Sequence, residues 1–181
     1  MRGIVLRSGR RGGARPPALH SDRMLTIREA APGEIPAAVD LLTRAFELIS
    51  WFRRADALFG PVNGRPWQER LRARIEKAPQ GQTVLLGFEG DALRACAVCG
   101  YDPKLGVGFL DLLGVEPAAH GQGHGRRMLR AFEDWARAQG AAAVNLDCLV
   151  DNDVGNALYA SEGYHELARQ IRWFKPLAPA E

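Results

Sequence analysis

The sequence has few cysteines and no long apolar run. Only three of its 181 residues are cysteine, so the thiols cannot all pair. That number argues against a disulfide-stabilised secreted scaffold and is typical of a reducing cytoplasm. No apolar run approaches the roughly 18 residues that a membrane-spanning helix needs. A Gly-Lys-Ser/Thr tripeptide is also absent, which excludes a Walker nucleotide-binding loop.

What is present is the composition of an ordinary globular domain, with 46% apolar and 25% charged residues. The length corresponds to one domain and a tail. A core fold of about 150 residues buries enough surface to be stable without a metal or a disulfide.

Positive charge is concentrated at the start of the chain. Residues 1–23 contain six arginines and one acid, so their net charge is +5. Because the whole chain has a net charge of +3, residues 24–181 have a net charge of −2. The segment is rich in glycine and contains Pro16-Pro17, so it cannot bury a core of its own. We expect a disordered basic extension over residues 1–23 that is dispensable for folding, followed by one domain over 24–181. A targeting segment or a nucleic-acid-binding arm is the alternative.

The periodicity of the remainder predicts a mixed α/β chain without internal repeats. Strands are predicted at residues 25–30, 83–88, 93–101, 107–115 and 143–149, with a closing hairpin of 165–169 and 171–174. Helices are predicted at residues 35–49, 67–77, 126–139 and 155–161, and a loop at 51–65. This order favours a mixed sheet of six or seven strands with helices on both faces.

A glycine-rich junction follows the strand predicted at residues 107–115. Gly121, Gly123 and Gly125 alternate just before the helix predicted to begin at Arg126. Glycine lets the backbone approach a ligand closely, and the N-terminus of a helix attracts anions. The junction therefore favours a diphosphate site.

A dinucleotide-binding turn is one interpretation of this junction. It requires Gly-x-Gly-x-x-Gly directly after the strand and an acid about 20 residues further on. Asp147 would suit that acid, but Arg126 or Met128 occupies the third glycine position, and residues 117–120 separate the strand from the glycines. We therefore discount the dinucleotide interpretation.

Two motifs make the chain resemble the GNAT superfamily of acyl-CoA-dependent N-acyltransferases. Residues 115–125 match the family pattern V-x-P-x-x-[RQ]-G-x-G-x-[GA], except that His120 stands where arginine or glutamine is usual. Residues 152–164 match N-x-x-[AG]-x-x-x-Y-x-x-x-G-[FY] in full. The resemblance covers roughly residues 25–176.

The resemblance implies a GNAT-like fold in which two central parallel strands, residues 107–115 and 143–149, splay apart. The pantetheine arm of acetyl-CoA then lies in the gap and pairs with the first strand. A backbone N–H near Leu113 would stabilise the oxyanion, and Asn152 would contact the pantetheine arm. The expected cofactor-binding residues are Leu113, Gly114, Val115, His120, Gly121, Gln122, Gly123, His124, Gly125, Arg126, Arg127, Asn152 and Asn156.

The reaction implied is direct attack of a neutral amine on the thioester. By resemblance Tyr159 is the general acid, since a phenol can return a proton to the leaving thiolate; a core tyrosine is the alternative. We expect Asp111 to be the base, because strand alternation places it on one face with Phe109, Leu113 and Val115. A chain of water molecules as the base, with Asp111 a structural acid, stays open.

Other residues give weaker indications of function. His120 and His124 have the spacing of metal ligands but lie in a glycine loop without a third ligand, so no metal is expected. Cys96 and Cys99 alternate onto opposite strand faces, which argues against a redox pair. Cys148 is interpreted as a small buried hydrophobic residue.

The sequence thus predicts a cytoplasmic acetyltransferase that uses acetyl-CoA. The acceptor is a small-molecule or peptide amine, with no nucleic-acid or membrane partner; a homodimer is left open. A non-catalytic acyl-CoA-binding domain is the alternative function.

Overall fold

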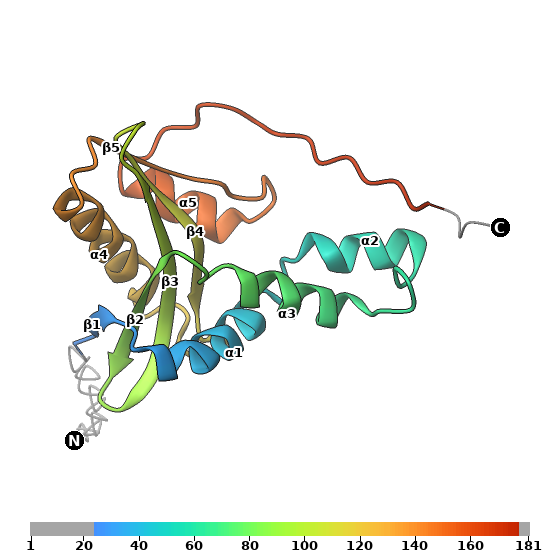
Figure 1. The fold of residues 1–181 in the computed structure, drawn as a ribbon, viewed down its shortest axis with the longest axis horizontal. Helices are drawn as coiled ribbons and strands as arrows, with labels where there is room; N and C mark the ends of the chain where they lie inside the picture. Colours follow the sequence, from blue (N-terminus) through green and yellow to red (C-terminus); the bar gives the residue numbers. More distant parts are fainter. Residues whose placement is uncertain (1–23, 178–181) are drawn as a thin grey trace, which may run out of the picture.

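The computed structural model describes residues 24–177. The extension expected over residues 1–23 lies outside the described residues. A five-stranded sheet forms the centre, in the spatial order β1-β2-β3-β4-β5 (Figure 1). The strands are β1 (Thr26–Glu29), β2 (Thr83–Glu89), β3 (Ala92–Asp102), β4 (Val107–Val115) and β5 (Ala143–Leu146). The first four are antiparallel to their neighbours, and β5 is parallel to β4.

Helices cover both faces of the sheet. They are α1 (Ile35–Phe46), α2 (Trp51–Phe59), α3 (Trp67–Lys77), α4 (His124–Ala138) and α5 (Asp153–Ser161). On one face α1 and α3 bury a cluster centred on Leu42, Ile75 and Leu86. On the other face α4 buries Met128 and Phe132 against the sheet, and α5 packs beside them. This confirms the predicted mixed sheet between two helical layers.

A β-bulge divides β4 at Asp111. Val98 of β3 pairs with Leu112, and the next residue, Cys99, pairs with Leu110, so Asp111 has no partner in the register. Such an extra residue interrupts the alternation of side chains along the strand. Beyond the bulge, residues 112–115 keep their pairing with β3 but have no pairing with β5, which ends at Leu146. The two parallel strands therefore splay, as expected.

One helix lies where the sequence predicted a loop. The sequence did not reveal α2 because the composition of residues 51–65, taken as a whole, is aromatic and rich in turn residues. The turn residues of this range all follow Phe59, where the helix ends. Ser50 caps this helix by accepting a hydrogen bond from the N–H of Phe52 at 3.2 Å, and Ala55 is its buried contact. The loop prediction was wrong for the first nine residues of that range.

The strand count is five rather than six or seven. The closing hairpin predicted at 165–169 and 171–174 is absent from the described residues, where positions 165–177 form an extended segment without strand pairing. We call these residues the C-terminal arm. The arm leaves the sheet after α5 and runs toward α2 (Figure 1), where the ring of Phe174 lies 5.7 Å from that of Phe59. Its backbone is therefore not available to β5 of the same chain in this conformation.

Candidate active site

The glycine-rich junction forms an open turn between β4 and α4. Gly121 and Gly123 have φ angles of 76° and 78°, in the left-handed region that glycine tolerates best. A Cβ atom built at either position would meet no protein atom within 4 Å. His120 closes the base of the turn, with Nε2 3.1 Å from the carbonyl oxygen of Val115. The concave side of the turn is therefore bare backbone.

The N-terminus of α4 leaves main-chain N–H groups unpaired within the described residues. The first bond of α4 runs from the N–H of Arg127 to the carbonyl of Gly123 at 3.2 Å, and no side chain caps the helix. The preceding N–H groups, at residues 124–126, have no acceptor within the described part of the chain. Together with the helix dipole, these donors suit a phosphate group.

The charged side chains of the turn are largely engaged within the protein. Arg126 forms an ion pair with Glu162 at 2.6 Å and donates to the Ser161 hydroxyl at 2.9 Å. His124 is buried beneath the turn with 2% of its surface exposed, so only its main chain faces the concave side. Burial lowers the pKa of its imidazole. Any anion held here thus relies on main-chain donors more than on the side chains of Arg126 and His124.

The splayed edge of β4 continues from the turn. Val115, Gly114 and Leu113 pair on one side with Ala95, Cys96 and Ala97 of β3. On their other side no strand is paired, because β5 reaches only as far as Leu110. The structure thus places the three residues predicted to pair with pantetheine along an open strand edge.

The second motif forms the loop between β5 and α5. Asn152 is the N-cap of α5: Oδ1 accepts from the N–H of Gly155 at 3.2 Å, while Nδ2 donates to Sγ of Cys148 at 3.4 Å. Asn156 donates to the carbonyl oxygen of Leu149 at 2.9 Å. A Cβ at Gly155 would lie 2.6 Å from the Asn152 amide, which explains the glycine. Both asparagines therefore hold the loop that faces the gap.

Tyr159 projects from α5 into the cluster on the α4 face of the sheet. Its ring lies 6.0 Å from that of Tyr164. Burial, with a smaller effect of the nearby Cys148, raises the pKa of Tyr159 to about 12. The phenol therefore keeps its proton throughout the physiological range and can act only as a donor there.

Asp111 lies on the opposite side of β4 from Tyr159. Its Oδ1 is 2.7 Å from Nη2 of Arg74 on α3, and its side chain is 16% exposed. The prediction that Asp111 shares a face with Leu113 and Val115 was wrong. Those two residues pack on the α4 side, because the bulge at Asp111 reverses the alternation. Leu112 packs instead with α1 and α3.

Arg74 is the residue of this site that the sequence did not reveal. It belongs to the polar face of a helix, 37 positions before its partner Asp111. Nothing in the local pattern distinguishes it from the other arginines of α3. A contact between a helix side chain and a bulged strand residue appears only once the packing is known.

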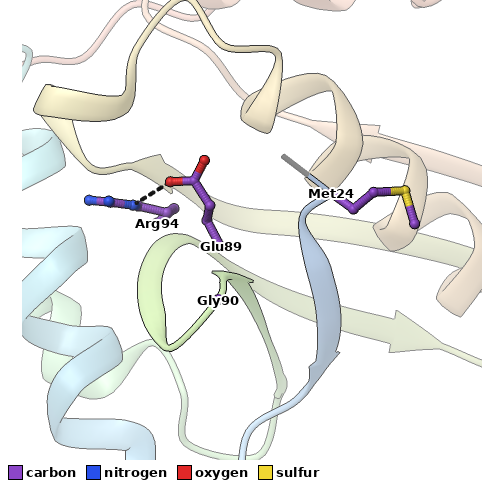
Figure 2. Close-up of a pocket in the computed structure, with 4 residues that line it drawn as sticks. All are labelled: Met24, Glu89, Gly90 and Arg94. Carbon is purple, nitrogen blue, oxygen red and sulfur yellow. Dashed lines mark hydrogen bonds and ion pairs between the residues drawn. The ribbon is translucent and has the colours of Figure 1, made fainter. Parts of the chain in front are cut away.

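Two further features, the cysteine pair of β3 and a surface hollow, do not belong to the predicted site. Cys96 and Cys99 lie in different core clusters on opposite sheet faces, as predicted. A hollow of about 390 Å³ lies at the turn between β2 and β3, lined by Met24, Gly90 and the ion pair of Glu89 with Arg94 (Figure 2). It contains none of the predicted site residues.

Residues 24–177 lack two further features. No group of three or more His, Cys, Asp or Glu side chains in that range could hold a metal ion. No helix in the same range is both long and apolar enough to cross a bilayer.

Comparisons with known proteins agree with the geometry. An N-alpha-acetyltransferase, RimI, from Mycobacterium tuberculosis is 40% identical over 63 residues, 35% of this chain and 38% of that protein. An aminoglycoside N(6')-acetyltransferase type 1 from Stenotrophomonas maltophilia is 33% identical over 103 residues, 57% of this chain and 65% of its own. The chain thus aligns with less than two thirds of either relative.

Solved structures share the fold. The ribosomal-protein-S18-alanine N-acetyltransferase from Escherichia coli matches with a TM-score of 0.58 at 23% identity, over 80% of both chains. The aminoglycoside N-acetyltransferase AAC(6')-Iy in complex with CoA matches with a TM-score of 0.57 at 17% identity, over 85% of this chain and 96% of that one. The profile of the Acetyltransferase (GNAT) family matches residues 43–164. This chain belongs to the GNAT acetyltransferase family.

Proposed function

We propose that this protein is an N-acetyltransferase that transfers the acetyl group of acetyl-CoA directly to a primary amine. The observation that carries the proposal is unpaired backbone at two neighbouring places, the N-terminus of α4 at residues 124–126 and the open edge of β4 at residues 113–115. A diphosphate and a pantetheine arm need these two surfaces in this order.

Coenzyme A fits the residues present. The left-handed glycines leave the concave side of the turn open, and the N–H groups of residues 124–126 can bind its pyrophosphate. Leu113, Gly114 and Val115 can hold the pantetheine arm as an added strand. In this proposal acetyl-CoA supplies an activated acyl thioester, and the protein supplies binding, orientation and proton transfer.

The roles of the side chains follow from the two faces of β4. Asp111 accepts the proton that the amine loses on attack, on the face of α3. A main-chain N–H near Leu113 stabilises the developing oxyanion. Tyr159, on the other face, donates its proton to the leaving sulfur and regains one from solvent. The C–N bond forms first as the carbonyl becomes an oxyanion, and the C–S bond breaks when this oxyanion collapses, so no acyl-enzyme is needed.

Asn152 and Asn156 take a structural part in addition to the direct contact first expected. Both amides hold the loop between β5 and α5, so we assign them the placing of Tyr159 as well as a contact with the pantetheine arm. His120, Gln122, Arg126 and Arg127 complete the surroundings of the phosphates.

The acceptor in this proposal is a small-molecule or peptide amine, the two kinds of acceptor named for relatives and structural neighbours. Neither a metal nor a nucleic acid takes part. Three free thiols suit a cytoplasmic location.

Release of free thiol from acetyl-CoA tests the proposal. The purified chain is incubated with acetyl-CoA and either a peptide with a free N-terminus or an aminoglycoside, and CoA is measured against controls without amine. Amine-dependent release with a matching acetylated product supports the proposal. Tight CoA binding without release from any amine would favour a non-catalytic acyl-CoA-binding domain instead.

A further inference from the structure

His124 has a buried imidazole that no hydrogen bond satisfies. It is the first residue of α4, and only 2% of its surface is exposed. Within residues 24–177 neither Nδ1 nor Nε2 has a hydrogen-bond partner. A buried N–H group that has lost its water without gaining a partner lowers stability, whereas an apolar side chain fills the same space without that cost. Stability therefore does not account for a histidine at this position.

The main chain of the same residue belongs to the proposed cofactor site. The N–H of His124 is one of the N–H groups at residues 124–126 that have no acceptor in the described part of the chain. The turn in front of it is open, since a Cβ atom at Gly123 would meet no protein atom within 4 Å. A diphosphate bound to these N–H groups would therefore lie on the open side of the main chain, while the imidazole lies on the buried side.

The charge of the imidazole depends on groups from three elements. Burial lowers the pKa of His124, Glu89 on β2 opposes this shift, and Arg127 on α4 and Arg94 on β3 add to it. The N-terminal end of the helix dipole also disfavours a positive charge. Glu89 and Arg94 form the ion pair of 3.2 Å that lines the hollow in Figure 2. Without a ligand the ring is thus more readily neutral than a histidine in water, although a carboxylate that favours its charged form lies nearby.

A bound diphosphate would change this balance. Each of its phosphates carries a negative charge, and charges near a buried group are screened much less than charges in water. An added negative charge favours imidazolium over imidazole. We propose that His124 takes up a proton when acetyl-CoA binds, so that a buried positive charge beneath the turn attracts the diphosphate. This inference rests on the proposed function, because it requires the diphosphate at the turn.

The proton comes from solvent and returns to it when CoA leaves, so the role of His124 is in binding and not in the chemical step. The bound anion raises the pKa of the imidazole above its value in the free protein. Affinity for the cofactor therefore rises as pH falls through the interval between these two pKa values. Above the interval the ring is neutral in both states, and below it the ring is charged in both, so the dependence ends at each side.

Proteins with a single histidine make the proton visible. The chain has four histidines, so His20→Gln, His120→Gln and His165→Gln together leave His124 alone, in a protein prepared without a histidine tag. The matched control carries His20→Gln, His120→Gln and His124→Leu and keeps His165, an exposed imidazole of the C-terminal arm. The control should melt at a higher temperature, because leucine replaces a buried polar group without a partner.

Calorimetry with 3′-dephospho-CoA gives the first test. This probe keeps the diphosphate but lacks the phosphate monoester of CoA, which itself titrates at about pH 6. Binding at pH 6.5 is measured in two buffers with different enthalpies of ionisation, and the difference gives the number of protons taken up. The protein with His124 should take up a fraction of one proton and bind about three- to tenfold more tightly at pH 6 than at pH 8. The control should take up none and bind equally at both.

Nuclear magnetic resonance gives the second test without any change at position 124. With Cε1 of histidine labelled by carbon-13, the His124 signal should titrate at a higher pH when 3′-dephospho-CoA is bound, and the His165 signal of the control should titrate alike in both states. A His124 titration that the probe does not change, or binding without proton uptake, overturns the inference and leaves the proposed function standing. If the wild-type chain binds no CoA at all, the proposed cofactor site is refuted and this inference with it.

Discussion

Nη2 of Arg74, on α3, lies 2.7 Å from Oδ1 of Asp111 on β4. The pair joins a helix to the one residue of β4 that the sheet register leaves without a partner. Ion pairs with partly exposed side chains contribute about 0–1 kcal/mol, so stability alone gives this contact little weight. In the proposed function its importance is orientation, because it fixes one carboxylate oxygen of Asp111 while the second would accept the proton.

Asp111→Asn should lower turnover by about 10²-fold near neutral pH, the lower end of what general base catalysis contributes. The loss should shrink as pH rises, because a larger fraction of the amine is then neutral without help. Thiol release measured from pH 6 to 10 checks this. Asp134→Asn, an exposed carboxylate on α4, is the matched control and should behave as wild type. A loss that stays constant with pH would assign Asp111 a structural role.

Tyr159→Phe should reduce turnover by about 10²–10⁴-fold while the affinity for acetyl-CoA stays unchanged. The hydroxyl is removed and the ring packing is kept. Because burial raises the pKa of Tyr159 to about 12, this phenol stays protonated below that pH and should add no inflection to the wild-type profile between pH 6 and 10. Steady-state kinetics and calorimetry separate the two effects, with Tyr101→Phe as control. Full activity of Tyr159→Phe would mean that another group, such as water, donates the proton.

Gly123→Val should abolish measurable binding of CoA in a protein that still folds. The side chain meets no protein atom, so it would occupy the concave side of the turn itself. The left-handed φ of 78° adds strain of about 1–2 kcal/mol. Gly64→Val is the matched control, since Gly64 has a φ of 67° and equally open surroundings away from the turn. Both variants should lose several degrees of Tm. In titration calorimetry only the first should lose CoA, and equal affinities would refute the placement of the pyrophosphate.

Asn152→Ala and Asn152→Asp should separate the two contacts of this side chain, the cap of α5 and the hydrogen bond to Cys148. Aspartate keeps an oxygen for the N–H of Gly155, whereas alanine loses the cap and about 1 kcal/mol of stability. Both lose the donor to Cys148. Thermal unfolding should therefore rank the proteins wild type, Asp, Ala. If both variants are equally stable, capping by Asn152 does not stabilise α5.

The sequence predicted those parts of the molecule whose signals lie within a few neighbouring residues. The turn at Gly121–Gly125 and the cap at Asn152 are encoded within a few residues, so their patterns could be recognised and the family identified. α2 was missed because aromatic residues resemble a strand or loop as much as a short helix. Arg74 was missed because its partner is distant in the chain. The C-terminal arm carries the alternation of a strand, but alternation does not specify which edge, or which molecule, a strand joins.

The bulge at Asp111 makes β4 depend on the number of its residues as well as on their identity. If the same residues followed regular alternation without the bulge, Leu113 and Val115 would turn toward α1, while Gly114 would turn toward α4. The open edge at residues 113–115 would then have its apolar side chains on the face opposite to the one where they now pack. A single-residue insertion or deletion between Leu112 and Val115 would exchange the faces in the same way, whereas a conservative substitution there would keep them.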